Sequence, residues 1–329
     1  MKQYLFLALV ALVFSACSTK EVYEPKVVAD DWDKTESISD DIIDTAANVA
    51  LLDNHHVLTK KGETNIVIPE NQRVVSLSDG KIISASIDGN VSVTDLESQE
   101  RNSYMLKKTI AAASIKDSIL AVVFANNDIA LYDTDKKSLI FKEQSGKAIA
   151  NDRRIVNPYF FNDLVMFPTL DGKIVIVKID AKKRLRTSII SSEPYFNNVI
   201  YFKLANNKLL GATSYKLLAL SKKELRKKYE IRNVVVDGDR IYLTTKQGEV
   251  IALTPDLQVE SKIKFPFAHF LGMIAYKDKL YILEKEGYLI VVDKSNFDYT
   301  VHEVDIDEDA FVFVGDDVFY VEDEKIILE

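Results

Sequence analysis

Few residues in this sequence are of the types that carry catalysis or bind metals. Among 329 residues there is one cysteine, Cys17, and there are four histidines, at positions 55, 56, 269 and 302. A single thiol excludes an internal disulfide, a Cys-Cys metal site and a CxxC redox pair. The chemistry open to Cys17 is therefore that of an isolated thiol, which could be a nucleophile, a redox sensor or a point of covalent attachment.

The residues before Cys17 favour attachment. Lys2 is followed by an uncharged apolar run from Gln3 to Ala16, which suits the central region of a signal peptide and is shorter than the roughly twenty residues of a membrane span. Ser15 and Ala16 stand directly before Cys17, and this pattern resembles the lipobox of bacterial lipoproteins. The resemblance implies that residues 1–16 are a signal peptide and that Cys17 is acylated and becomes the first residue of the mature chain. The alternative is a plain secretory signal followed by a free or buried thiol.

An acidic stretch follows the cysteine. Between Asp30 and Asp44 seven acidic residues face only one basic residue, Lys34, and no apolar period is present. Such segments repel themselves and stay extended. We therefore expect residues 17–45 to form an acidic flexible tether, with a partner-docking segment around Trp32 as the alternative.

The overall charge limits the class of partner. Lys and Arg total 42 against 50 for Asp and Glu, so the net charge is −8. Nucleic-acid binding needs a basic face, and the composition therefore argues against nucleic acid as the main partner.

Beyond residue 70 the sequence repeats. A turn followed by an apolar strand recurs at Ile82, Ile119, Leu164, Leu209, Ile241, Leu280 and Val318, and a second strand always begins eight to ten residues later. Each unit reads as four strands separated by short turns. Four-stranded antiparallel sheets that recur about every 40 residues predict a β-propeller, which closes the sheet edges by forming a ring.

The number of units sets the expected blade count. Six units are complete and the seventh lacks its outer strand, so we expect seven blades, with Thr64–Glu70 pairing with the C-terminal strands to close the ring. The hairpin before it would be an addition to that ring; if it belongs to a further blade, the count is eight. The propeller domain is expected to cover residues 46–329 as a monomer.

The third strand of each unit resembles the repeat of quinoprotein (PQQ-like) propellers. Asp95, Asp133 and Asp293 match the aspartate of that repeat, and Phe141 and Tyr229 fall at its docking tryptophan. Among such propellers, the lipoprotein is the BamB-type component of the outer-membrane β-barrel assembly complex. The resemblance implies a periplasmic scaffold that is anchored in the outer membrane through Cys17 and binds other envelope proteins, among them the β-barrel assembly machinery. Ser18, in place of Asp, agrees with outer-membrane sorting of the enterobacterial type.

The remaining candidates for chemistry are weak, and we expect no catalytic residue, no cofactor and no metal site. A quinone enzyme needs a stacking tryptophan, and the propeller units contain none. His55 and His56 lie at a predicted hairpin turn, where polar residues are ordinary. Asp305–Ala310 resembles the start of a calcium loop but has Ala310 where such loops need glycine.

We therefore expect a non-enzymatic, protein-binding propeller. Two alternatives remain: a ligand-binding or degenerate quinoprotein-like propeller, and a surface adhesin. The basic runs at Lys182–Arg186 and Lys222–Lys228 fit either solvated turns or a docking patch for an acidic partner or lipid headgroups.

Overall fold

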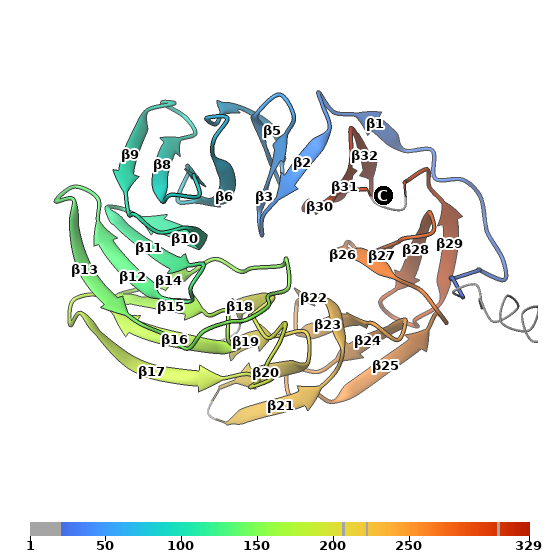
Figure 1. The fold of residues 1–329 in the computed structure, drawn as a ribbon. Helices are drawn as coiled ribbons and strands as arrows, with labels where there is room; N and C mark the ends of the chain where they lie inside the picture. Colours follow the sequence, from blue (N-terminus) through green and yellow to red (C-terminus); the bar gives the residue numbers. More distant parts are fainter. Residues whose placement is uncertain (1–20, 206–207, 222, 308–309) are drawn as a thin grey trace, which may run out of the picture.

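The computed structural model describes residues 21–205, 208–221, 223–307 and 310–329. These ranges form eight four-stranded antiparallel sheets arranged around a central axis, as Figure 1 shows. The prediction of an all-β propeller with four-stranded antiparallel blades is confirmed, but the expected count of seven is wrong. Within the same ranges, no helix is long and apolar enough to cross a membrane.

The blades follow one another along the chain, and we number them 1 to 8. Blade 1 consists of β2 (Ile42–Thr45), β3 (Val49–Leu52), β4 (His56–Thr59) and β5 (Gly62–Val67), and blade 2 of β6 (Arg73–Ser78), β7 (Lys81–Ala85), β8 (Asn90–Asp95) and β9 (Arg101–Met105). Blade 3 consists of β10 (Ile110–Lys116), β11 (Ile119–Phe124), β12 (Ile129–Asp133) and β13 (Ser138–Glu143). Blade 4 consists of β14 (Tyr159–Phe161), β15 (Leu164–Pro168), β16 (Lys173–Lys178) and β17 (Lys183–Ile189).

Blade 5 consists of β18 (Tyr201–Ala205), β19 (Lys208–Ala212), β20 (Lys216–Leu220) and β21 (Glu224–Lys228). Blade 6 consists of β22 (Ile231–Asp237), β23 (Arg240–Thr245), β24 (Glu249–Leu253) and β25 (Val259–Lys264). Blade 7 consists of β26 (Phe270–Tyr276), β27 (Lys279–Glu284), β28 (Tyr288–Asp293) and β29 (Tyr299–Glu303). Blade 8 combines β30 (Val312–Val314), β31 (Val318–Val321) and β32 (Glu324–Ile327) with β1 (Thr35–Ser37) from the other end of the chain.

The core lies between blades. In blades 1 to 7 most residues of the second and third strands are buried, and their apolar side chains pack on the neighbouring blade. Val91 and Val93 of blade 2, for example, share one buried cluster with Leu120 and Val122 of blade 3. Because each blade is covered on both faces in this way, closure of the ring buries apolar surface that a separate blade would expose.

The ring closes through pairing of the two ends of the chain. Thr35 pairs with Ile326, and Ser37 pairs with Glu324, so β1 becomes the outer strand of blade 8. N-terminal and C-terminal strands do meet, as expected, but the strand is not Thr64–Glu70. That segment mainly supplies β5, the outer strand of blade 1, and the hairpin before it supplies β3 and β4. The innermost strand of blade 1 is β2, which lies in the segment assigned to the tether.

The segment that leads into β1 is bound to the propeller, which corrects the expected flexible tether over its described part, residues 21–45. Residues 21–33, which we call the strap, cross the outer edge of blade 7. Tyr23 is 5% exposed and its ring contacts Phe265 and Tyr288 edge-on. Further along, the backbone N–H of Ala29 donates to the carbonyl of Val301 (2.9 Å). Apolar and backbone contacts therefore outweigh the repulsion between the acidic side chains.

Trp32 ends the strap inside the fold. Its indole N–H donates to the carbonyl of Ile327 (3.0 Å), and its ring packs edge-on against Tyr281 and His302. His302 in turn contacts the carboxylate of Asp30 at 2.5 Å. These contacts tie the strap to blades 7 and 8. The half-buried position of Trp32 does not support a role for it in docking another protein.

The repeat aspartates have a structural role. Asp95 accepts hydrogen bonds from the backbone N–H groups of Glu97 and Ser98, both at 3.0 Å. Asp133 and Asp293 do the same for the turns that follow their own strands. The repeated aspartate thus caps the turn between the third and fourth strands of a blade.

The turn between the second and third strands has its own requirement. Gly248 has φ +75°, and a Cβ there would lie 2.0 Å from the carbonyl oxygen of Phe265, whose N–H donates to the carbonyl of Gly248 (2.7 Å). His55 takes the corresponding place in blade 1: its φ is +64°, and its carbonyl accepts from Ile68 N–H (3.1 Å). This backbone position explains His55 without a metal.

Candidate functional site at the mouth of the channel

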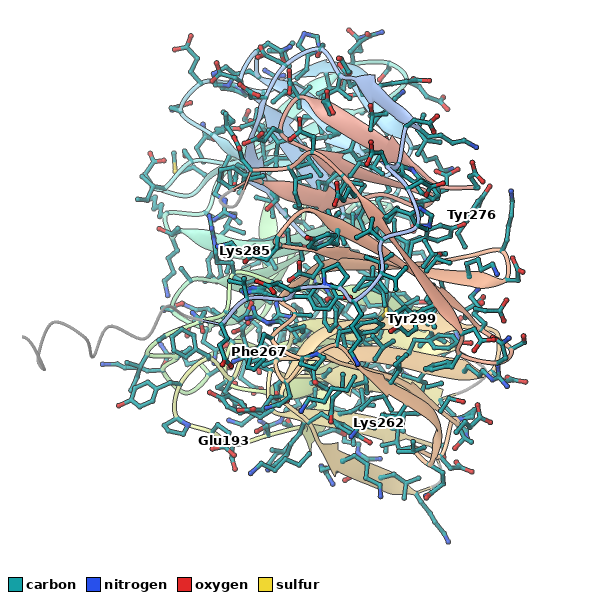
Figure 2. All side chains as sticks on the ribbon, turned by 90° about the vertical axis from the view of Figure 1, so that its right-hand side faces the viewer. Glu193, Lys262, Phe267, Tyr276, Lys285 and Tyr299 are labelled. Atoms are coloured by element: carbon teal, nitrogen blue, oxygen red, sulfur yellow. The ribbon has the colours of Figure 1, made fainter. Side chains whose placement is uncertain are left out.

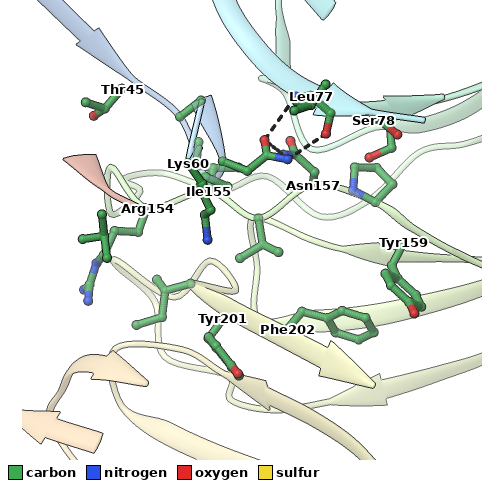
Figure 3. Close-up of a pocket in the computed structure, with 18 of the residues that line it drawn as sticks. Thr45, Lys60, Leu77, Ser78, Arg154, Ile155, Asn157, Tyr159, Tyr201 and Phe202 are labelled. Atoms are coloured by element: carbon green, nitrogen blue, oxygen red, sulfur yellow. Dashed lines mark hydrogen bonds between the residues drawn. The ribbon is translucent and has the colours of Figure 1, made fainter. Parts of the chain in front are cut away.

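A cavity of about 710 Å³ opens at the centre of the ring. Its walls come from the innermost strands of most blades and from one long connection. Aromatic side chains line one side, with Tyr159 and Phe160 from β14 and Tyr201 and Phe202 from β18. Figure 3 shows the rings of Tyr159, Tyr201 and Phe202 on the side opposite Lys60 and Thr45. A space of this size and mixed lining suits a ligand or a segment of a partner chain.

The long connection is the segment from residue 144 to residue 158, which joins β13 to β14 and which we call the channel segment. It turns into the centre of the ring in Figure 1. Asn198 holds it there: its side-chain oxygen accepts from the N–H of Asp152 (2.6 Å) and its side-chain amide donates to the carbonyl of Arg154 (2.9 Å). Asn157 also reaches Asn48 of blade 1 (3.4 Å), across the cavity from β18.

An ion pair fixes the middle of the channel segment. Arg154 pairs with Asp152 and also donates to the carbonyl of Arg232, while Ser214 donates to Asp152 (2.9 Å). Burial by itself would raise the pKa of Asp152, but hydrogen bonds and attraction from Arg154 outweigh it and lower that pKa to about 2. Burial and the nearby Arg154 charge lower the pKa of Arg232. The channel segment is therefore held by charged groups and not by apolar packing alone.

The mouth of the cavity is cationic. The charged side chains that line it are Lys60, Lys116, Arg153 and Arg154, against a single carboxylate, Asp79. Arg154 is neutralised by Asp152. Among the residues that the structure describes, no carboxylate forms an ion pair with Lys60, Lys116 or Arg153. The Arg153 guanidinium lies 5.6 Å from the ring centre of Phe311, a cation–π contact that leaves its charge in place.

This arrangement can bind an acidic or anionic group. Three cations around one opening attract negative charge, and the low-dielectric walls of a channel strengthen that attraction. Aromatic rings on the far wall add apolar contact area for the rest of a ligand. The site contrasts with the net charge of −8 for the whole chain.

The residues singled out in the sequence lie elsewhere. Cys17 falls outside the described residues, as does part of Asp305–Ala310. His55 and His56 occupy a turn of blade 1 and do not line this cavity, and no group of three potential metal ligands occurs among the residues that the structure places.

The described part of the two basic runs lies mainly on the outer strands β17 and β21 of neighbouring blades. Arg186 and Arg226 both pair with Glu224, and most of the other side chains of these runs are exposed to solvent.

Sequence reasoning missed the channel segment. One signal was present: the step from Ile119 to Leu164 is 45 residues, several more than the spacing of most units. The excess length marks an enlarged connection, and Arg153-Arg154 lies in it. No motif, however, indicates that this connection turns inward.

Comparisons with known proteins give relatives in sequence and in fold. No family model matches the chain. It is 27% and 26% identical to the plasminogen-binding protein PgbB of two strains of Helicobacter pylori, in each case across 92% of this chain. The chain spans 65% and 64% of the length of these two relatives.

Among solved structures, BamB from Moraxella catarrhalis superimposes with a TM-score of 0.70 at 11% identity, covering 88% of this chain and 97% of BamB. The C-terminal WD40 domain of Sif2 gives a TM-score of 0.66 at 12% identity, covering 90% of this chain and 98% of that domain. Identities this low show the fold alone. The chain thus has a BamB-like β-propeller fold, and its sequence is similar to that of the plasminogen-binding proteins of Helicobacter pylori.

Proposed function

We propose that this chain is a lipid-anchored protein of the bacterial cell envelope whose propeller binds a protein partner at the mouth of its channel. The observation that carries the proposal is the cationic opening formed by Lys60, Lys116 and Arg153, backed by aromatic side chains. The partner would present an acidic segment to this opening. The activity is one of binding and not of catalysis.

Plasminogen is the first candidate partner. The support is the sequence match with proteins named for plasminogen binding, which extends over 92% of this chain. The experiment is a titration of the purified full-length protein, immobilised in detergent, with plasminogen, read by biolayer interferometry. Saturable binding is expected; a flat response up to high micromolar plasminogen would exclude this partner.

The β-barrel assembly machinery is the second candidate, because the fold resembles that of BamB. On this version the protein lies at the outer membrane and faces the periplasm. Crosslinking of intact envelopes followed by affinity purification should then recover components of that machinery. Their consistent absence, with plasminogen binding present, would assign the protein to the cell surface.

The anchor is tested through Cys17. Acylation of Cys17, as the lipobox resemblance implies, would place wild-type protein in the membrane fraction. Cys17→Ser should move the protein to the soluble fraction, while its thermal unfolding stays unchanged because the propeller uses no cysteine. A variant that still sediments wholly with membranes would contradict the anchor.

A further inference from the structure

The position of the strap limits how far the propeller can lie from its anchor. Tyr23 is buried between Phe265 and Tyr288, so the chain is fixed to the propeller from this residue onward. Tyr23 lies six positions after Cys17, and even a fully extended chain of six residue steps spans no more than about 21 Å. A flexible tether over residues 17–45 would allow several times that distance.

The contacts along the strap resist peeling. Beyond Tyr23, the N–H of Ala29 donates to Val301, and the N–H of Trp32 donates to the carbonyl of Glu303 (2.8 Å). The strap then enters β1, which is paired along its length with β32. Extension to the length of a free tether over residues 17–45 would therefore require loss of both the Tyr23 socket and these backbone bonds.

The surface around the Tyr23 socket carries exposed apolar side chains. Phe267 is 58% exposed and Tyr299 is 48% exposed, and the Tyr299 ring packs 4.9 Å from that of Phe265. Val22 and Val27 on the strap are exposed as well. Figure 2 shows Phe267 and Tyr299 on the side of the molecule that the strap crosses.

Phe267 is held outward by its backbone. It has φ +66°, a left-handed conformation that is unfavourable for an aromatic residue. The strained turn lies between Phe265, which contacts Tyr23, and Ala268, which is buried. Aromatic side chains that are anchored at one end and exposed at the other suit the interface between lipid headgroups and acyl chains.

We propose that the edge formed by Val22, Phe267 and Tyr299 at blades 6 and 7 faces and contacts the lipid bilayer. The occupant is the bilayer because the chain outside the described residues leads from this edge, within about 21 Å, to the proposed acyl anchor. Charges near the edge are of both signs: Lys262 is paired with Glu249, and Glu24 and Glu286 lie close to Tyr288. We therefore infer that contact rests on the apolar side chains and not on anionic lipid. This inference rests on the proposed anchoring at Cys17.

The ring supplies a matched control position. Leu139 on β13 is 52% exposed, close to the value for Phe267, and blade 3 stands across the ring from blade 7, as Figure 1 shows. Since acylation occupies Cys17, Phe267→Cys and Leu139→Cys each introduce one labelling site in the mature protein. The full-length lipidated variants carry an environment-sensitive fluorophore and are reconstituted in phosphatidylethanolamine/phosphatidylglycerol vesicles with nitroxide-labelled lipid.

The label at position 267 should be quenched several-fold more strongly than the label at position 139. Insertion of twenty Gly/Ser residues between Lys20 and Glu21 should abolish that difference while the protein stays with the vesicles. Equal quenching at both positions without the insertion overturns the membrane-facing edge and leaves the anchor intact. Wild-type protein that fails to sediment with vesicles overturns the anchor, and the edge with it.

Discussion

Asp152 shows how a single charged residue can hold the candidate site together. Its carboxylate accepts from Arg154 and Ser214, and its pKa is lowered to about 2. A carboxyl group whose pKa is lower in the folded state than in the unfolded state stabilises the fold at pH values above its unfolded-state pKa. That contribution is lost as the pH falls from about 4 to about 2. The channel segment should therefore loosen in acid.

Asp152→Asn should lower the free energy of unfolding at pH 7 by roughly 2 kcal/mol, because a shift from 3.8 to about 2 corresponds to that energy and Arg154 loses its partner. At pH 2 the difference from wild type should nearly vanish. Urea denaturation at both pH values measures it, with the exposed Asp53→Asn as the control. An equal loss at both pH values would show that the ion pair is not the cause.

At the scale of single elements, the repeated turns decide which residues the blades tolerate. Gly248 has left-handed backbone with no room for a Cβ, while His55 carries a side chain at the corresponding turn of blade 1. A larger residue in place of Gly248 should therefore destabilise the propeller, whereas glycine in place of His55 should not.

Gly248→Ala should destabilise the propeller by at least about 2 kcal/mol, since backbone strain and the contact with the Phe265 carbonyl add. His55→Gly should be neutral or stabilise by up to about 1 kcal/mol, because release of left-handed strain exceeds the entropy cost of glycine. Thermal or urea unfolding of each variant measures these changes. Strong destabilisation by His55→Gly would mean that the imidazole has a function that the turn does not explain.

The elements also show what the sequence could predict. Constant spacing of turns and alternating apolar residues predicted the four-stranded blades, because each blade repeats the same local pattern. Strands β1 and β2 were missed because β1 consists of three exposed residues and β2 has only one buried residue, Ile42. The partner of β1 is β32 at the other end of the chain, which no local pattern records, while β2 pairs with the adjacent strand β3. The blade count failed for this reason.

The candidate site was less predictable than the fold. Lys60, Lys116 and Arg153 come from three separate connections and strands, and only ring closure brings them to one opening. No local motif records such a juxtaposition. The enlarged step between blades 3 and 4 indicated an unusual connection, but its inward path depends on Asn198 and Asn48, far from it in sequence.

At the scale of the whole molecule, the propeller combines an acidic chain with a cationic opening. The strap fixes one edge of the ring near the proposed anchor, and the channel mouth lies at its centre. Long-range repulsion from the net charge of −8 would keep acidic proteins away, so binding of an acidic segment depends on local attraction at the opening. Partner binding should therefore weaken as salt is added.

The most direct test reverses the charge of the opening. Lys60→Glu, Lys116→Glu and Arg153→Glu are combined in the full-length protein, and its affinity for plasminogen is measured by interferometry beside wild type and the exposed control Lys137→Glu. The account predicts saturable binding by wild type and control, and a loss of at least about tenfold in affinity, about 1.4 kcal/mol, in the triple variant. Unchanged affinity of a correctly folded triple variant would contradict it.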